Sequence, residues 1–381
     1  MPAIVKMVRA RGGGVGIEPS SGTTMRRLEP TSLWIWMLPA VLYGCGSQRN
    51  AETASHRTPA TTMTNAEDET TAIASSVASP GASSAASSAA SPPWQGRLLL
   101  DHALVGRVYS MERGQASSPQ ELIGAVGAAR FALLGERHDH PDHHRRQALI
   151  VREALAGKST PAVAFEMFDR TEQSTIDEHF ASRPGDAFGL GGAVGWERKG
   201  WPAWSMYAEI VQAAVDQGAR VVAANLSRSE VMSAAKSGTF PWDGEPRPVP
   251  EMPADELEAM KEELYHAHCQ HLPKAMMGAM ATAQIARDAT LASTMVAADR
   301  GDGTILITGN GHARKDRGVP WHLRNQGVEG TIVSVGFLEV REGLTEPAAY
   351  GQQGEPPPYD FVWFTPAWER EDPCATFQGK E

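Results

Sequence analysis

Cysteine is scarce in this chain of 381 residues, which contains only Cys45, Cys269 and Cys374. No pair of Cys-x-x-Cys motifs and no His-Glu-x-x-His motif is present, so the spacings that identify zinc sites are missing. Gly-x-Ser-x-Gly is also absent, so there is no nucleophile elbow of the serine-hydrolase kind. Neither a zinc site nor a serine nucleophile is therefore supported by motif spacing.

Positive charge is in the minority, with 35 Lys and Arg against 45 Asp and Glu and a formal net charge of −10. No Lys/Arg-rich stripe with interleaved aromatic residues occurs, which argues against nucleic acid as a partner. The hydrophobic fraction of 41% is ordinary and sufficient for a sizeable core. The length fits two average domains, or one α/β domain with tails.

The longest apolar run near the N-terminus, Leu33 to Leu42, is too short to span a bilayer but has the length of a signal-peptide core. It follows the basic start Met25-Arg26-Arg27 and precedes Leu42-Tyr43-Gly44-Cys45, which resembles a bacterial lipobox. We interpret residues 1–45 as a signal and lipoprotein segment, with Met25 as the true start and Cys45 as the lipidated residue. The alternatives are a plain signal peptide and a buried apolar segment. We expect a protein of the bacterial cell envelope, lipid-anchored to a membrane and facing the periplasm or the exterior.

Residues 46–93 consist largely of Ala, Ser, Thr and Pro, a composition that cannot bury enough apolar surface to fold. We predict a disordered tether whose roughly 50 residues reach about 40 Å on average. The folded domain is expected over 94–375, with 376–381 as a tail.

Strand and helix patterns alternate through the predicted domain. Apolar runs predict strands at 105–109, 131–134, 162–165, 220–224, 304–308 and 331–335, and helices are expected at 141–156, 171–180 and 204–217. Ser118, Pro119 and Glu121 predict a capping box at an earlier helix, and Asp255 with Glu258 predicts a cap for a later one. This order predicts an α/β fold with a mainly parallel sheet flanked by helices. Residues 250–300 are expected to form a helical insertion subdomain.

Four predicted strands end in polar side chains. Glu136, Arg137 and His138 follow the strand predicted at 131–134. They lie in a run that places four of the twelve histidines in residues 138–144. Because parallel strands end at one edge of a sheet, these groups are expected to converge there. Such a set can hold a cation, bind an anion or perform acid/base chemistry. The alternative is a solvated His-rich turn leading into a helix near Pro141. The other strand ends carry Glu166, Asn225, and Gly309-Asn310-Gly311-His312 followed by Arg314.

Two further groups of residues could line a binding site. The predicted insertion carries His266, His268 and His271, and its Met stripe, typical of core, is interrupted by Gln284 and Asp288. That polar pair predicts either a structural network through Arg287 or a pocket wall. Tyr207 follows Trp196, Trp201 and Trp204, which could wall a flat apolar cofactor, since tyrosine and histidine both ligate haem iron. Simple packing of these aromatic residues is the alternative.

The sequence over about 102–375 resembles the ChaN-like haem-binding lipoproteins, part of a wider group that includes the Tiki and erythromycin-esterase proteins. The motifs that carry the resemblance occur in the expected order: Leu134-Gly135-Glu136-Arg137-His138-Asp139 with His143-His144, Ala164-Phe165-Glu166-Met167, Trp204-Ser205-Met206-Tyr207, Ala223-Ala224-Asn225, Ala283-Gln284-Ile285-Ala286-Arg287-Asp288, Gly309-Asn310-Gly311-His312 with Gly318-Val319-Pro320, and Asp360-Phe361-Val362-Trp363-Phe364-Thr365-Pro366.

This resemblance implies a membrane-tethered protein that binds haem in haem or iron uptake, and it implies that a homodimer could hold haem between its subunits. Tyr207 is the first candidate for the iron ligand, and His268 and His271 come second. We also assign haem contacts to four further residues, Arg137, Arg314, Gln284 and Asp288.

The alternative function is a hydrolase, because the wider group contains an esterase and a protease. Glu136, His138, Glu166 and His312 would then activate water, directly or through a divalent metal ion. A carrier needs an exposed apolar groove near Tyr207, whereas a hydrolase needs these four groups within hydrogen-bond reach of one point.

Cys269 and Cys374 are the only thiols left once Cys45 is lipidated, and the signal segment directs them to an oxidising compartment. We predict that they form a disulfide; the alternative is a free Cys269 thiol near the haem pocket and an exposed Cys374. The segment from Asp360 to Asp372 has little apolar periodicity, so the disulfide is expected to hold it in place.

Overall fold

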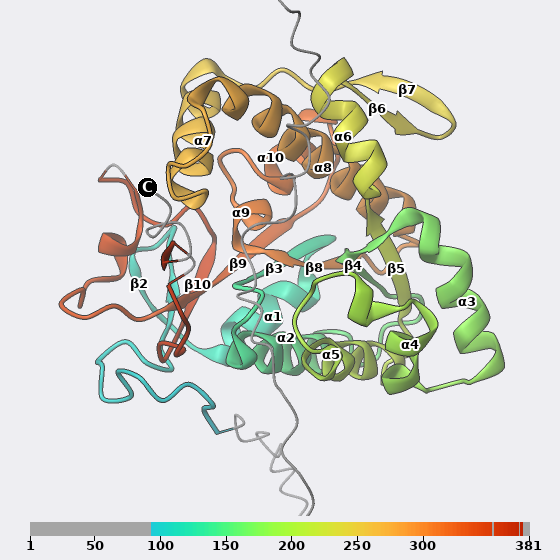
Figure 1. The fold of residues 1–381 in the computed structure, drawn as a ribbon. Coiled ribbons are helices and arrows are strands. Elements are labelled where there is room, and N and C mark those ends of the chain that lie inside the picture. The colour runs from blue at the N-terminus through green and yellow to red at the C-terminus, as the bar shows by residue number, and fades with distance from the viewer. Residues whose placement is uncertain (1–92, 353, 373, 376–381) are drawn as a thin grey trace, which may run out of the picture. The chain divides into compact units, whose positions relative to one another are not determined.

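An eight-stranded sheet organises the domain. The structure, a computed structural model, describes residues 93–352, 354–372 and 374–375, so Cys45 and nearly all of the predicted tether lie outside the described residues. The strand order is β2-β1-β10-β9-β3-β8-β4-β5, and the six strands from β10 to β5 run parallel (Figure 1). This confirms the predicted fold class. The strand bounds are β1 Val108–Ser110, β2 Gln115–Ser117, β3 Phe131–Glu136, β4 Ala162–Asp169, β5 Arg220–Asn225, β8 Thr304–Gly309, β9 Ile332–Glu339 and β10 Phe361–Thr365.

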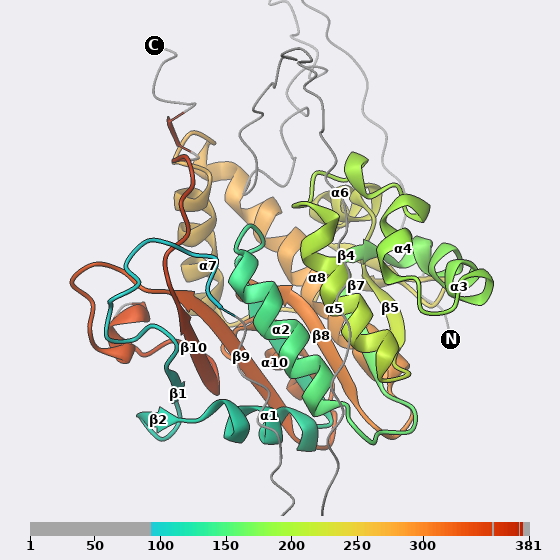
Figure 2. The same ribbon diagram turned by 90° about the horizontal axis from the view of Figure 1, so that it is seen from below.

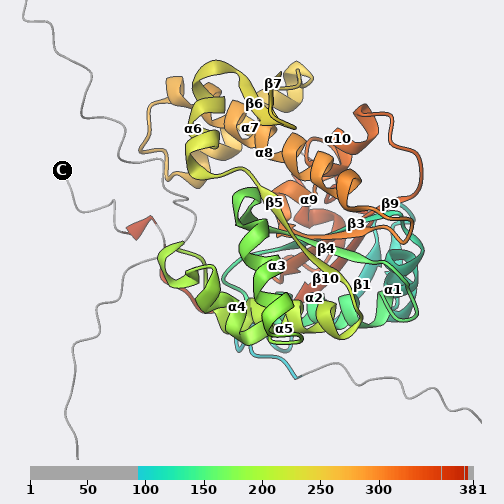
Figure 3. The same cartoon turned by 90° about the vertical axis from the view of Figure 1, so that its right-hand side faces the viewer.

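Helices cover both faces of this sheet (Figures 2 and 3). One layer contains α1 (Pro119–Ala128), α2 (Pro141–Ala154) and α5 (Trp204–Asp216), with α3 (Gln173–Ser182) and α4 (Ala187–Ala193) beside them. The opposite layer contains α8 (Met277–Ala298), α9 (Asn310–Ala313) and α10 (Val319–Asn325). Alternate strand residues divide between two cores: Leu134 packs on the α2 side and Leu133 on the α8 side. Burial on both faces explains why the strands are continuous apolar runs.

Part of the predicted helical insertion covers one face of the sheet. The second half of α8 packs on the sheet through Leu291 and Met295. Its first half lies beyond the sheet with α6 (Arg228–Ser237), α7 (Ala254–Ala267) and a hairpin of β6 (Thr239–Trp242) and β7 (Glu245–Pro248). Within the described ranges, no helix is long and apolar enough to cross a membrane.

Two predicted helix caps are wrong in detail. Ser118 caps α1 by accepting from the Glu121 amide at 3.1 Å, but the Glu121 carboxylate accepts from Ser117 and Arg113 and does not return to the cap. No side chain caps α7, whose N-cap residue is Pro253. The nearby Ser and Arg donors outcompete the Ser118 amide for Glu121.

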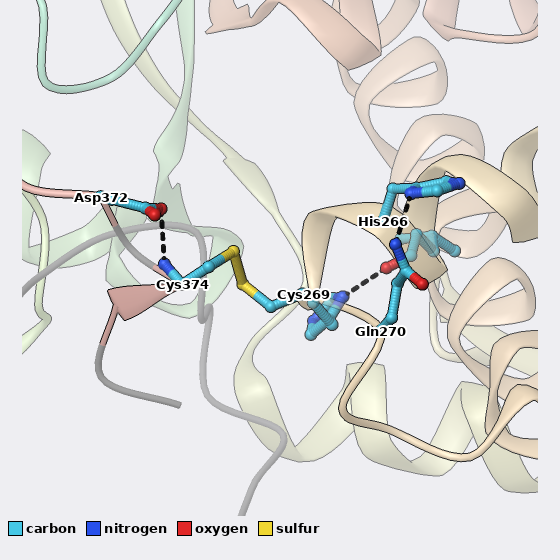
Figure 4. Close-up of a disulfide and its surroundings, with 7 residues drawn as sticks. His266, Cys269, Gln270, Asp372 and Cys374 are labelled. Atoms are coloured by element: carbon cyan, nitrogen blue, oxygen red, sulfur yellow. Dashed lines mark hydrogen bonds between the residues drawn. A yellow bond between two sulfur atoms is a disulfide. The ribbon is translucent and has the colours of Figure 1, made fainter. Parts of the chain in front are cut away.

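The C-terminal segment was expected to dock weakly, and this expectation is wrong. Phe361 to Thr365 form β10, fully buried between β1 and β9. The predicted disulfide is confirmed: Cys269 and Cys374 are bonded, with a Cα–Cα distance of 5.5 Å (Figure 4). It joins the loop after α7 to the segment that follows β10.

Candidate functional site

The polar ends of β3, β4 and β8 converge as predicted. Glu136 ends β3, Glu166 lies in β4, and His312 lies on α9 directly after β8. Glu136 and Glu166 are each only 2% exposed, so both carboxyl groups are withdrawn from solvent. Buried charge of this kind needs partners. These partners are His138, His144, Tyr207, Thr308 and His312, and His312 is held in turn by Asp288.

Glu136 is the centre of the first half of the cluster. Its Oε1 accepts hydrogen bonds from the Tyr207 hydroxyl at 2.7 Å and from His138 Nδ1 at 2.8 Å. Tyr207 is itself fully buried, with its ring edge-on to His144. The hydroxyl therefore holds a carboxylate and does not face solvent.

His144 also faces Glu136 in this half of the cluster. Its Nε2 lies 2.8 Å from the His138 carbonyl oxygen, which can only accept, so Nε2 carries hydrogen. Its Nδ1 faces Glu136 Oε2 at 3.3 Å, and both atoms are buried. The His144 ring thus lies against the second oxygen of the same carboxyl group.

Glu166 is the centre of the second half. Its Oε2 accepts from the Thr308 hydroxyl at 2.7 Å and the Gly309 amide at 2.8 Å, and its Oε1 lies 3.3 Å from His312 Nε2. Burial alone would raise the pKa of Glu166, but the charge of His312 and these hydrogen bonds hold it well below its usual range. Glu166 is therefore ionised.

His312 lies between two carboxylates, because its Nδ1 is 2.6 Å from Asp288 Oδ1. Burial opposes its charged form, but Glu166 and Asp288 outweigh burial and raise the pKa of His312 to about 10. The ring is thus an imidazolium with both N–H groups committed. Asp288 was expected either to join a network through Arg287 or to line a pocket; its hydrogen bond goes to His312.

His138 is where the cluster approaches the surface. Its side chain is 16% exposed and its ring lies edge-on to Trp201, with centroids 4.9 Å apart. Burial opposes its charged form, but the Glu136 hydrogen bond and the field of Glu166 raise the pKa of His138. Its Nε2 lies over Gly309, 2.9 Å from the position that a Cβ would occupy.

The solvated-turn interpretation of residues 138–144 is wrong. His140, His143 and His144 are at most 1% exposed, and the His140 and His143 rings stack with centroids 4.1 Å apart. His140 Nε2 donates to the Pro366 carbonyl, and His143 Nε2 lies 3.0 Å from Thr365 Oγ1. These two rings connect α2 to the end of β10, a structural role.

Several predicted site residues lie outside the cluster. Arg137 lies near Asp139 and Glu339, and Arg314 pairs with Asp316. Gln284, partly buried, lies one turn before Asp288 on α8. Among the described residues, His268 makes no hydrogen bond with a cluster residue; its Nδ1 lies 2.7 Å from the Leu264 carbonyl oxygen. His271 is exposed near the disulfide loop. Of the other strand-end groups, Asn225 joins the cluster, donating to the Glu166 carbonyl oxygen at 3.0 Å.

His144 and Thr308 belong to the site but were not predicted from the sequence. Thr308 stands directly before the Gly309-x-x-His312 turn, where a hydroxyl reaches a carboxylate on the neighbouring strand. His144 lies six residues after His138, in the first turn of α2, and only the path of α2 beneath β3 shows that it returns to Glu136. The role of Thr308 could have been predicted from its neighbours in the sequence, whereas the role of His144 depends on the path of α2.

In the described parts of the chain, no group of three or more His, Cys, Asp or Glu side chains has the arrangement of a metal site. The hydrogen bonds explain this, because an imidazolium with two committed N–H groups has no lone pair for a metal. Two hollows, of about 370 and 520 Å³, lie at the β6–β7 hairpin and between α7 and α8. Neither is lined by a residue of the cluster.

These features define an α/β protein with a buried histidine–carboxylate site at the carboxyl ends of its parallel strands. The chain belongs to the family described as haem-binding uptake, Tiki superfamily, ChaN, which matches residues 122–323 and so includes the whole cluster.

The chain is similar to several solved structures, and the first of these supports the fold. ChaN of Campylobacter jejuni, whose haem binding is cofacial, is 22% identical, with a TM-score of 0.55 over 67% of this chain and 95% of its own. An erythromycin esterase, EreC, in its open conformation is 15% identical, with a TM-score of 0.35 over 72% of this chain and 86% of its own. The type III effector HopBA1 is 14% identical, with a TM-score of 0.36 over 65% and 93%. No curated protein matches.

Proposed function

We propose that this protein is a membrane-tethered haem-binding lipoprotein that serves haem or iron uptake in the bacterial cell envelope. Membership of the ChaN haem-binding family is the observation that carries the proposal. The lipid anchor at Cys45 is supported by the lipobox-like sequence alone. The Campylobacter jejuni relative binds haem cofacially, and we extend this to a homodimer that encloses haem between its subunits.

Tyr207 does not fit an iron ligand in this conformation, because it is fully buried and donates its hydroxyl to Glu136. A haem ligand must reach a surface large enough for the macrocycle. His138 fits better: it is partly exposed, its Nδ1 is held by a carboxylate, and the Trp201 ring lies beside it. A carboxylate partner increases the basicity of a ligating imidazole.

Exposed apolar surface lies along the stretch of chain that contains Trp201. Phe188 is 57% exposed, and its carbonyl oxygen accepts from the Trp204 indole at 2.9 Å. Trp201, Trp204 and Met206 are partly buried against the core of the α2 layer. We propose that haem lies against this aromatic surface next to His138. When bound, the haem would supply iron as the reactive centre of the site.

Haemin titration into the full mature chain tests the proposal. Saturable binding with a Soret shift is expected, and His138→Ala should change the position of the Soret band while Tyr207→Phe leaves it in place. The paired variant His268→Ala, His271→Ala should also leave it in place. An unchanged spectrum in His138→Ala with a changed one in Tyr207→Phe would restore Tyr207 as the ligand, and no saturable binding would refute the haem function.

A second candidate is a hydrolase, favoured by the convergence of Glu136, His138, Glu166 and His312. The Glu166–His312–Asp288 half is fixed by hydrogen bonds, whereas His138 Nε2 has no hydrogen-bond partner among the described residues and could take a proton from water. The test is ester or peptide hydrolysis by the metal-free protein, compared with Glu166→Gln. Activity that is lost in this variant, while its haem affinity is retained, would establish the hydrolase.

A further inference from the structure

Three consecutive leucines form the most apolar exposed turn of the described chain. Leu98, Leu99 and Leu100 are 45%, 37% and 43% exposed, and the other large hydrophobic side chain exposed among the described residues is Phe188. Single exposed leucines are common, but three in one turn form a contiguous apolar projection.

The backbone holds these leucines outward in a fixed conformation. Leu99 has φ +56°, a left-handed conformation that a bulky side chain rarely adopts, and its carbonyl oxygen accepts from the His102 amide at 3.0 Å. Leu98 exchanges two backbone hydrogen bonds with Ala367, and the Gly96 amide donates to the buried Asp142. Leu99 thus occupies a backbone conformation that favours Asn or Gly, and hydrogen bonds of the neighbouring residues hold it in place. A conformation of this kind indicates that the exposed Leu99 side chain has a function.

The position of the turn indicates its partner. It begins six residues into the described chain, where the tether that starts at Cys45 joins the domain. A flexible tether of roughly 50 residues would have a mean reach of about 40 Å, so a lipid anchor at Cys45 would keep the turn near the membrane at a high effective concentration. The formal net charge of −10 opposes electrostatic attraction to anionic lipid, so contact would depend on apolar burial.

We propose that the turn Leu98–Leu100 is a membrane-docking element that inserts its leucines into the interfacial region of the bilayer that carries the lipid anchor. Trp368, the residue after the strand partner of Leu98, is partly exposed and suits the same interface, where tryptophan is enriched. Docking would fix the orientation of the domain on the membrane. This inference rests on the proposed lipid anchor.

Hydrogen–deuterium exchange on the lipidated mature protein in vesicles of phosphatidylethanolamine and phosphatidylglycerol tests the inference. In the vesicle-bound wild type, backbone amides of residues 98–104 should exchange about tenfold more slowly than in the unlipidated Cys45→Ser variant in detergent-free solution. The reason is that docked amides are shielded from water. Adding salt should leave this protection unchanged, since charge does not drive the contact.

Leu99→Asn is the decisive variant. Asn tolerates the left-handed conformation, so the variant should fold at least as stably as the wild type while losing the vesicle-dependent protection. Phe188→Asn removes an exposed apolar side chain elsewhere and should keep it. Protection that persists in Leu99→Asn with Leu100→Asn, or that is absent from the anchored wild type, overturns the inference.

Failure of the anchor gives a different result. A wild type that carries no lipid on Cys45 refutes the lipoprotein proposal and not the docking turn. In that case cosedimentation of the unanchored protein with excess vesicles, compared with the Leu99→Asn variant, decides: equal binding by both overturns the docking turn. A Leu99-dependent dimer in solution, without vesicle binding, would overturn it in favour of a second copy of this chain.

Discussion

His312 and Asp288 lie 24 residues apart in the chain, and a hydrogen bond of 2.6 Å joins His312 Nδ1 to Asp288 Oδ1. This contact connects α8, which begins in the helical insertion, to the carboxyl end of β8. On its other side the same ring faces Glu166. The insertion therefore supplies one of the charges that fix the state of the site.

Replacing His312 by Gln should destabilise the fold by about 3–5 kcal/mol, because Glu166 and Asp288 would remain buried without their shared cation. The pKa of His312 is raised to about 10, so its stabilising effect is complete below about pH 6.5 and is lost as the pH rises through about 10. In this window its contribution should decrease by about 1.4 kcal/mol per pH unit.

Urea unfolding at several pH values measures this contribution. The His312→Gln variant should lack the decrease that is specific to His312. His266→Gln, at an exposed ring that pairs with Glu262, is the matched control and should cost less than about 1 kcal/mol. Equal costs for the two variants would contradict the imidazolium bridge.

His322 should make the fold sensitive to acid. Burial, with a contribution from the charge of His312, lowers the pKa of His322 to about 3, so the ring stays neutral in the fold but takes up a proton when the chain unfolds below about pH 6.5. Stability should therefore fall by about 1.4 kcal/mol per pH unit between about pH 6 and pH 3 on account of this residue.

His322→Phe removes this proton uptake and should flatten the acid limb of the stability curve. His322 Nε2 is buried and has no hydrogen-bond partner among the described residues, so the substitution should cost little at pH 7. Thermal unfolding from pH 4 to pH 7 shows the difference. An acid limb as steep as that of the wild type would show that His322 is not the responsible group.

The Cys269–Cys374 disulfide should stabilise the fold mainly through the unfolded chain. It closes 105 residues of sequence, for which the chain-entropy model gives on the order of 4 kcal/mol. Cys374→Ser should lower the urea midpoint without displacing β10, because β10 is buried in the sheet and Arg370 still pairs with Asp139 and Glu339. Loss of protection across β10 in hydrogen exchange would contradict this expectation.

The sequence alone predicts most of the parallel strands, because they are short apolar runs that end in Gly or in a polar side chain such as Glu166 or Asn225. The strand β10 was not predicted. Phe361 to Thr365 has no alternation of apolar and polar residues, which is typical of a strand buried on both faces. The β6–β7 hairpin within the Pro-rich connection was not predicted either. Asp243 and Gly244 both have positive φ there, the conformation of an Asp-Gly hairpin turn.

The convergence of the site was predictable because parallel strands end at one edge. Its internal pairing was not, since pairing depends on helix paths. Asp288 was recognised as a polar interruption of an apolar stripe, but only the position of α8 shows that it meets His312. Tyr207 was recognised as aromatic and polar, yet its depth beneath β3 decides that its hydroxyl binds Glu136.

Gly309 makes room for the His138 ring. Its φ of −65° is open to any residue, so space alone requires glycine here. A Cβ would lie 2.9 Å from His138 Nε2 and 3.1 Å from Cε1. In Gly309→Ala the ring must move, which weakens its hydrogen bond to Glu136, lowers the His138 pKa and costs about 1–3 kcal/mol.

Gly311→Ala is the matched control on the next turn, because a Cβ there meets nothing within 4 Å. NMR titration of the His138 ring in both variants, together with urea unfolding, separates the two positions. Only Gly309→Ala should shift the His138 titration to lower pH, and the same variant should alter the spectrum of bound haemin if His138 is its ligand. An unshifted titration in Gly309→Ala would show that the ring has room to spare, and that Glu136 and Trp201 hold it in place without help from the glycine.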